Sequence, residues 1–414
     1  MLPPASRDGR RCVVLGAGVV GLTTALLLQR NGWRVTVVAA ATPEAYDEAD
    51  PAYASPKAGA DWTSFAAEDD LRLKEFEVES FKVLEALSRH PAGIVGLMPS
   101  RTLMPRQPAG WKRPWFAEHV PGVRASLSPT HTVPAHISVA RRMTLTRVCD
   151  RVLCTMHISQ FRTLAPAEIP APYTFGYEHT TVSVNVPRYL AHLLAAFRDN
   201  GGELDAPRKV AHIDDLIAAF PGVDVFVVCA GLGARTLGGV ADETVVPVRG
   251  QIAVIKADVA YAACVVESES ENVFAMEELT YIIPRNDGTC IIGGTCIRGD
   301  SDMAVRPETF GRIVERATAL HEDISAWASL HGASEAGIEA GVVRHAVGLR
   351  PVRRDGIRID ASAYDAPTRR VVLAHHYGHG GYGFQTSWGS AMAAVKAIES
   401  ASLQFEVACA YPAA

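Results

Sequence analysis

The first forty residues constrain the fold more strongly than any other part of the chain. The stretch RRCVVLGAGVVGLTTALLLQRNGWRVTVVAA predicts an apolar strand at 12–15, a glycine-rich turn, a helix with apolar positions at helical spacing, and a second strand at 34–38. Strand, glycine motif, helix and strand in this order indicate a Rossmann-type unit that binds a dinucleotide. An ordinary turn of this kind with chance glycines is the alternative.

Three glycines of this turn have separate physical roles. Gly16 permits the tight turn, Gly18 lets the backbone approach a pyrophosphate, and Gly21 lets the helix pack closely on the sheet. The start of the helix offers unpaired N–H groups and a positive dipole end to phosphates. The second strand, however, runs into Ala39 and Ala40, where an acidic residue usually holds the adenosine ribose. This argues against a standard NAD site and leaves the ribose contact unassigned.

Composition and charge point to a small molecule as the partner. The chain is 48% apolar and 21% charged, so it can bury a sizeable core. Its formal net charge is -5 and no basic block stands out, so neither nucleic acid nor an anionic membrane is expected. No stretch reaches the roughly 18 apolar residues of a membrane span. Eight cysteines without a CxxC pair suggest a reducing compartment.

The middle of the chain combines a second glycine turn with antiparallel strands. An apolar strand runs into glycines in DVFVVCAGLGARTLGG, at 224–239, as at the ligand-facing edge of an open α/β sheet. ETVVPVRGQIAVIKA and LTYIIPRNDGTCIIGGT predict antiparallel strands, the second turned at 286–288. Helices are expected at about 307–330, and an exposed helix at 68–90.

The predicted fold class is α/β, with a Rossmann-type nucleotide-binding domain assembled from discontinuous segments. An α+β substrate domain with a mainly antiparallel sheet interrupts it, and the active site is expected where the two meet. The nucleotide-binding segments are 1–65, 174–240 and 340–405; the substrate-binding segments are 66–122 and 241–339.

Residues 123–160 form an atypical insert with five arginines, one acidic residue and no glycine. Three interpretations stay open: a basic surface loop, a disordered stretch, or a retained in-frame intron in the gene model. The intron hypothesis rests on a valine codon beginning with GT at 123 and a glutamine codon ending in AG at 160. A transcript containing these 38 codons would exclude it.

A third glycine run, HHYGHGGYGFQTSWG, lies close to the end of the chain at 375–389. His375, His376 and His379 have no carboxylate or cysteine near them in sequence, so metal binding is not expected. A strand is predicted before the run and a helix after it. The run therefore repeats the strand, glycine turn and helix of the first forty residues.

With AGLGA, VRGQ, YIIP, VGLRP and YGHGGYG following the first motif in order, the chain resembles the D-amino-acid oxidase family, which includes D-aspartate oxidase. The resemblance covers the chain apart from 123–160 and the extreme ends. It implies an FAD-dependent enzyme that oxidises a D-amino acid to an imino acid, which water hydrolyses to a 2-oxo acid and ammonia. Dioxygen would reoxidise the flavin and yield hydrogen peroxide.

The resemblance also assigns site residues. The substrate would contact Tyr281, Arg350 and the backbone of Gly381, and no acid/base residue is expected because hydride transfer from Cα needs none. Arg350 has a planar fork of donors for a carboxylate, although a surface ion pair is its alternative role, as a half-buried sheet tyrosine is for Tyr281. The residues expected to bind FAD are Gly16, Ala17, Gly18, Val19, Gly21, Ala39, Ala40, Ala58, Gly59, Val210, Gly380, Gly381, Tyr382, Gly383, Phe384 and Gln385.

The segment before Tyr281, ESESENVFAMEEL, departs from the family. Glu277 stands where some members carry a tyrosine, and Phe274 and Met276 offer no positive charge for a second carboxylate. The five glutamates of the segment would repel one. Neutral or basic D-amino acids are therefore expected in preference to D-aspartate, although these glutamates could also form a solvated face.

Other functions remain open from sequence alone. They are a D-aspartate oxidase, a glycine or sarcosine oxidase-like enzyme, a quinone-linked D-amino-acid dehydrogenase, and a catalytically inactive flavin-binding protein. The family is often peroxisomal, but the chain ends in YPAA rather than an SKL-type signal, so a cytoplasmic location is the alternative. Family members commonly dimerise, which leaves a homodimer open.

Overall fold

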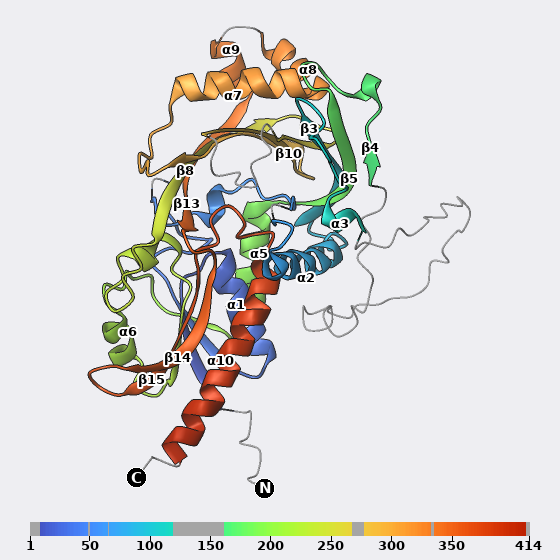
Figure 1. Cartoon of the computed structure of the whole chain (residues 1–414). Helices are drawn as coiled ribbons and strands as arrows, with labels where there is room; N and C mark the ends of the chain where they lie inside the picture. The colour runs from blue at the N-terminus through green and yellow to red at the C-terminus, as the bar shows by residue number, and fades with distance from the viewer. Residues whose placement is uncertain are drawn as a thin grey trace, which may run out of the picture.

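The protein is described by a computed structural model that covers residues 9–48, 50–64, 66–118, 161–266, 277–332 and 335–410. Two sheets form two lobes, one above the other in Figure 1. The predicted insert at 123–160 lies outside the described residues. None of the helices that the structure describes is both long and apolar enough to cross a membrane.

Six of the described strands form the first sheet, in the order β14-β15-β7-β1-β2-β6. Neighbouring strands are parallel except β14 and β15, which form an antiparallel pair. The two strands predicted in the first forty residues are confirmed as the adjacent pair β1 and β2. The strands are β1 (Arg11–Leu15), β2 (Arg34–Val38), β6 (Glu203–Leu204), β7 (Val225–Val228), β14 (Arg358–Asp365) and β15 (Arg370–Tyr377).

Both faces of this sheet are buried, which explains the continuous apolar runs at 12–15 in β1 and 225–228 in β7. Cys12 and Val14 of β1 pack in the cluster that contains α1, while Val13 and Leu15 face the cluster that contains α6. Figure 1 shows α10 lying beside α1 along the sheet. The helices of the first face are α1 (Val19–Arg30), α5 (Val186–Asp199) and α10 (Ser387–Ala410), and the helix of the second is α6 (Ile213–Ala219).

The second sheet has the order β12-β8-β11-β10-β9-β3-β5-β4, and β13 pairs with β8. It is antiparallel apart from the pair of β3 and β9, and the predicted turn at 286–288 joins β10 to β11. Its strands are β3 (Val95–Met104), β4 (Arg162–Thr163), β5 (Phe175–Val184), β8 (Val245–Lys256), β9 (Ala262–Val265), β10 (Glu278–Pro284), β11 (Thr289–Thr295), β12 (Ile297–Arg298) and β13 (Val342–Arg353).

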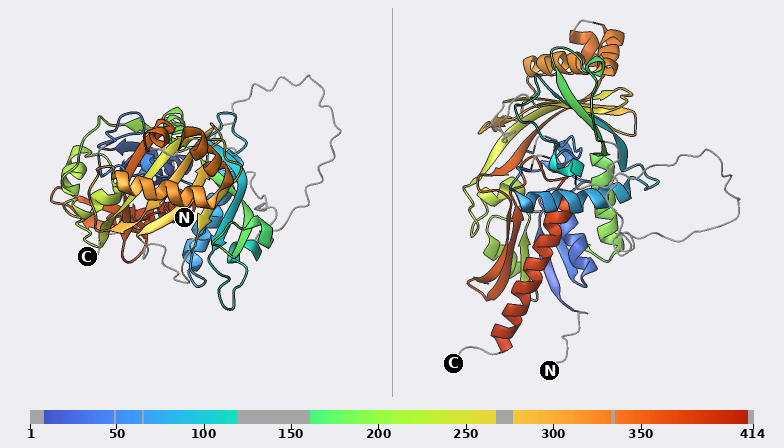
Figure 2. Two further views of the ribbon diagram at one scale, coloured as in Figure 1. Left: turned by 90° about the horizontal axis from the view of Figure 1, so that it is seen from above. Right: turned by 45° about the vertical axis from the view of Figure 1, so that its right-hand side comes forward.

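Helices cover the face of the second sheet that points away from the first lobe (Figures 1 and 2). α7 contacts β8, β10 and β11, and its apolar side chains join theirs in one buried cluster. The helices are α7 (Pro307–Leu320), α8 (Glu322–His331) and α9 (Glu335–Ala340). The α/β class and the mainly antiparallel second sheet are therefore confirmed.

The sheets divide the chain differently from the predicted segments at two places. β5 lies within 174–240 and β13 within 340–405, yet both strands belong to the second sheet. β5 pairs with β3 along ten residues, and β13 pairs with β8 along almost its whole length. Alternating apolar residues identify a strand but not its partner, which lies far away in sequence. Elsewhere the segment bounds stay predictions.

The helix predicted at 68–90 is α2 (Leu71–Leu87), and the prediction that it is exposed was wrong. Asp70 caps its start by accepting a hydrogen bond from the backbone N–H of Leu73 at 2.8 Å. Leu71 is 75% exposed, but Phe81 and the other apolar residues of one face are buried. That face packs against α10 and β3, so α2 joins the two lobes.

Candidate active site

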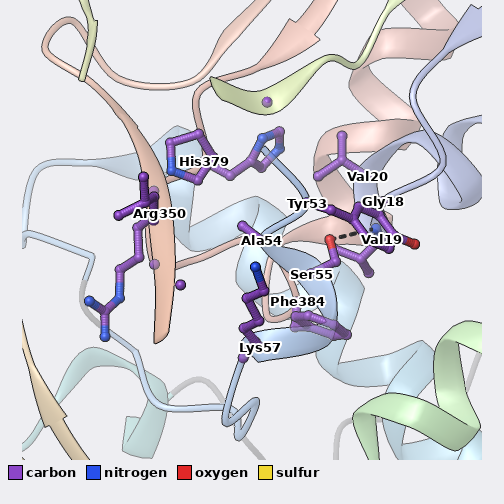
Figure 3. Close-up of a pocket in the computed structure, with 18 of the residues that line it drawn as sticks. Gly18, Val19, Val20, Tyr53, Ala54, Ser55, Lys57, Arg350, His379 and Phe384 are labelled. Carbon is purple, nitrogen blue, oxygen red and sulfur yellow. Dashed lines mark hydrogen bonds between the residues drawn. The ribbon is translucent and has the colours of Figure 1, made fainter. Parts of the chain in front are cut away.

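A cavity of about 700 Å³ lies between the two sheets. Its walls come from the carboxyl ends of β1, β2, β7 and β15 and from residues of β8, β10 and β13. This is the edge at which open α/β sheets bind ligands, and the volume falls within the roughly 300–1,000 Å³ of small-molecule sites. Figure 3 shows the start of α1 on one side of the cavity and Arg350 on the other.

The first glycine turn forms a backbone cradle in which side chains do not fit. Gly16 has a φ of +119°, and a Cβ on it would lie 2.4 Å from the carbonyl oxygen of Cys229. The helix N-cap, Gly18, brings no side-chain cap, and the N–H of Val19 donates to Ser55 Oγ at 3.0 Å (Figure 3). The cradle thus leaves backbone N–H groups at a helix start, which suits a pyrophosphate.

Gly21, which was predicted to bind the cofactor, does not line the cavity. A Cβ on Gly21 would lie 2.0 Å from the carbonyl oxygen of Gly16, so this residue acts by packing α1 against the turn. The other predicted cofactor residues all line the cavity: Gly16, Ala17, Gly18, Val19, Ala39, Ala40, Ala58, Gly59, Val210, Gly380, Gly381, Tyr382, Gly383, Phe384 and Gln385.

The last glycine run is held in place by buried polar contacts. The amide nitrogen of Gln385 donates to Glu77 Oε1 at 2.9 Å and to the backbone carbonyl of Thr63 at 2.8 Å. Glu77 is fully buried on α2 and also accepts a hydrogen bond from Ser64 at 2.6 Å. The orientation of Gln385 towards the cavity is therefore fixed by two other segments.

The three histidines of this run contact three different partners. His376 Nδ1 lies 2.9 Å from Thr24 Oγ1, and His379 Nε2 lies 3.0 Å from Ser390 Oγ. Burial lowers the pKa of His379 to about 3 and that of His376 well below its usual value, so both rings are neutral. His375 lies 2.7 Å from a carboxylate that the sequence did not place there, that of Asp360.

These contacts give the histidines a structural role, because they tie the glycine run to α1, α10 and β14. Across the described ranges, no three His, Cys, Asp or Glu side chains are grouped as a metal site would require.

Arg350 lies on β13 where that strand pairs with β8. Its Nη1 donates to the backbone carbonyl of Thr295 at 2.9 Å. A Cβ on Gly250 would lie only 2.4 Å from Nη1, so the guanidinium occupies the space above this glycine. The glycine of the VRGQ motif therefore has a physical purpose, which is to let Arg350 lie against the sheet.

Tyr281 is placed by the neighbouring strand in the same way. It pairs with Gly293 on β11, and a Cβ on Gly293 would lie 2.4 Å from its ring. Burial raises the pKa of Tyr281, and Arg350 only partly opposes this rise, so the hydroxyl keeps its proton and can donate it in a hydrogen bond. Arg350 and Tyr281 both line the cavity, and Arg350 lies close enough to the Tyr281 hydroxyl to lower its pKa, so both could donate to one carboxylate.

Sequence reasoning missed several charged residues of the cavity. Lys57 belongs to the 3-10 helix η1 (Ser55–Lys57), is 5% exposed, and donates to the carbonyl of Asp50. Asp61 lines the cavity together with Tyr281. Arg208, two residues before Val210, donates its backbone N–H to the carbonyl of Ala39 at 2.9 Å. The available signal in the sequence was the basic pair Arg208 and Lys209, which lines the cavity with Ala39 and Ala40, where an acidic residue is missing.

The glutamates before Tyr281 do not all act as predicted. Glu278 forms ion pairs with Arg312 at 2.7 Å and with Arg316 at 2.6 Å, both on α7. Its charge is thereby largely compensated, so it does not repel a substrate carboxylate. Glu277 is exposed, and nothing in the structure tests its predicted repulsion of a second carboxylate. The other residues of this segment, 267–276, lie outside the described residues.

This chain is similar to known proteins over most of its length. Residues 11–397 match the family model described as FAD dependent oxidoreductase. A D-amino-acid oxidase of Schizosaccharomyces pombe is 30% identical over 391 residues, which are 93% of this chain and 95% of the relative. The D-aspartate oxidase of Homo sapiens is 28% identical over 397 residues, 94% of this chain and 95% of the relative.

Among solved structures, glycine oxidase from Geobacillus kaustophilus matches with a TM-score of 0.61 at 17% identity, covering 94% of this chain and 95% of that chain. Together with the glycine cradle, these relations define the class as a flavoprotein oxidoreductase. The chain belongs to the family of FAD dependent oxidoreductases represented by the D-amino-acid oxidases. The predicted family, cofactor and enzyme class are thereby confirmed.

The residues present fit FAD on structural grounds. Because Gly16 and Gly18 carry no side chains, the space in front of α1 stays open to a pyrophosphate. The cavity continues from there past 380–385 to Tyr281 and Arg350. The cradle would hold the dinucleotide end, and the last glycine run would lie against the flavin ring.

Proposed function

We propose that the chain oxidises D-amino acids with neutral or basic side chains. The product would be an imino acid that water hydrolyses to a 2-oxo acid and ammonia, with dioxygen reduced to hydrogen peroxide. One observation carries this proposal: Arg350 and Tyr281 converge in the same cavity that begins at the glycine cradle. A carboxylate held there would bring its Cα close to a cofactor bound along the cradle.

Each step assigned to this chain is one of binding or orientation. Arg350 would grip the substrate carboxylate with its remaining guanidinium donors, and the Tyr281 hydroxyl would donate to the same group. The carbonyl of Gly381 would accept a hydrogen bond from the substrate amine. Bound FAD supplies the redox chemistry, as acceptor of the hydride from Cα. No acid/base side chain is required for this step, provided that the amine binds in its neutral form.

The charges of the cavity support neutral or basic substrates over D-aspartate. Relatives named D-amino-acid oxidase and D-aspartate oxidase have similar identities to this chain. Asp61, however, lines the cavity next to Tyr281, and its carboxylate would repel a second carboxylate on the substrate. Comparing kcat/KM for D-alanine, D-methionine, D-lysine and D-aspartate tests this preference. D-Aspartate as the best substrate would contradict it.

Release of hydrogen peroxide tests the reaction itself. Purified protein with FAD should release peroxide and ammonia with D-alanine but not with L-alanine. Peroxide from glycine or sarcosine alone would favour a glycine oxidase-like enzyme. Reduction by D-alanine without peroxide would indicate a dehydrogenase that uses another acceptor. A homodimer and a peroxisomal or cytoplasmic location stay predictions from the family resemblance.

A further inference from the structure

Asp61 is held rigidly at the wall of the cavity. The residues on both sides of it hydrogen-bond to β5: the N–H of Trp62 donates to the carbonyl of Val182 at 3.0 Å, and that of Val184 donates to the carbonyl of Ala60 at 2.8 Å. Asp61 itself bridges to Ser183. Its position in the cavity is therefore fixed by the second sheet and does not depend on a free loop.

The carboxylate of Asp61 faces the same space as Tyr281 and Cys264. Its Oδ2 accepts a hydrogen bond from Thr63 Oγ1 at 2.9 Å. Burial and, to a smaller extent, the Asp61 carboxylate raise the pKa of the Tyr281 hydroxyl and of the Cys264 thiol. Asp61 therefore lies at the substrate end of the cavity, near Tyr281 and Cys264.

No described basic side chain pairs with Asp61. Lys57 bonds to the carbonyl of Asp50, and Arg350 bonds to the carbonyl of Thr295. Burial raises the pKa of the Asp61 carboxyl group, and Arg350 does not offset this rise. Asp61 is only partly exposed, and an ionised carboxylate without a counter-charge is unfavourable there, so a cationic ligand would stabilise it.

We propose that Asp61 determines side-chain specificity: its carboxylate, supported by the Thr63 hydroxyl, receives the cationic end of a basic D-amino acid such as D-lysine or D-ornithine. Arg350 and Tyr281 would hold the α-carboxylate at the other end of the same substrate. The inference rests on the proposed function, since it names the substrate class of that site.

The variant Asp61→Asn tests this role, because it keeps the shape and the hydrogen bond to Thr63 but removes the charge. D-Lysine and D-norleucine are a suitable substrate pair, since they differ mainly in the terminal ammonium group. For D-lysine, kcat/KM should fall roughly 10-fold to 100-fold, whereas for D-norleucine it should stay within about 2-fold. The matched control is Asp69→Asn, which removes the same charge from an exposed position outside the cavity.

A binding measurement separates this inference from the proposed reaction. 6-Aminohexanoate and hexanoate resemble the two substrates but lack the α-amine, so they bind without being oxidised. Their Kd values follow from the perturbation of the flavin absorption. The unaltered protein should bind 6-aminohexanoate more tightly than hexanoate, and Asp61→Asn should lose this preference even if no D-amino acid is oxidised.

Three results would overturn the assignment. One is an equal loss of kcat/KM for D-lysine and D-norleucine, which would mean that Asp61 acts on a group common to all substrates. Another is no change for either substrate. The third is a preference of the unaltered protein for hexanoate over 6-aminohexanoate.

Discussion

Replacing Gly250 with alanine tests how the substrate-binding arginine is positioned. The new Cβ would lie 2.4 Å from Nη1 of Arg350 and 2.8 Å from its Cζ. Nonbonded heavy atoms normally stay roughly 3.5 Å apart, so the guanidinium must move by about 1 Å. This shift would disrupt the 2.9 Å hydrogen bond from Nη1 to the carbonyl of Thr295. Arg350 would then no longer point at the substrate carboxylate in the same way.

The expected loss follows from one charge-assisted hydrogen bond. Such a bond is worth about 1.5–3 kcal/mol, so kcat/KM for D-alanine should fall roughly 10-fold to 150-fold. FAD should remain bound, because the cradle around Gly16 is not altered. Steady-state peroxide release and the flavin content of the purified variant measure the two effects separately.

Gly96→Ala provides a matched control in the same sheet. A Cβ there has its nearest neighbour at 3.7 Å, an ordinary contact, so activity should be retained. A Gly250→Ala variant with unchanged kcat/KM would refute the idea that the glycine positions Arg350. Loss of FAD together with activity would show instead that Gly250 supports the fold.

Three further changes have definite expected results. Tyr281→Phe removes one donor to the substrate carboxylate and should raise KM for D-alanine about 10-fold at unchanged FAD content, whereas an unchanged KM would remove Tyr281 from the site. Gly16→Ala should weaken FAD binding at least about 10-fold, measured by flavin fluorescence, because φ is +119° and the new Cβ meets a carbonyl; a variant that stays yellow would contradict the cradle. Burial would raise the pKa of Asp360, but hydrogen bonds from His375 and Arg358 hold it at about 2. These bonds therefore stabilise the fold above the unfolded pKa of 3.8, and the stabilisation is lost as pH falls towards 2. The free energy of urea unfolding of Asp360→Asn should be lower than that of the unaltered protein at pH 6 and nearly equal to it near pH 2.

Local requirements made the nucleotide-binding half predictable from sequence. The strand, turn and helix around Gly16 depend on backbone geometry within a few residues, so their pattern is visible in the chain itself. The strand at 12–15 is apolar throughout because both faces of the sheet are covered. The partner of β5, in contrast, is not encoded near it, and its assignment to the first domain did not match the sheet in which it lies.

The substrate end was harder to predict, because its residues depend on contacts across the second sheet. Tyr281 and Arg350 were identified by the family resemblance. Gly250 and Gly293 were missed as site residues, since each is required only by a side chain on the neighbouring strand. Asp61 looks like an ordinary solvated acid in the sequence. Its role emerges only when the fold places it in the cavity beside Tyr281.

The central claim is that one cavity holds FAD next to the carboxylate site formed by Arg350 and Tyr281. An absorption spectrum of the FAD-containing protein, recorded anaerobically before and after addition of D-alanine, tests it most directly. The claim predicts that D-alanine bleaches the visible flavin absorption, that L-alanine does not, and that air restores it. A yellow protein whose spectrum no D-amino acid changes would contradict the claim.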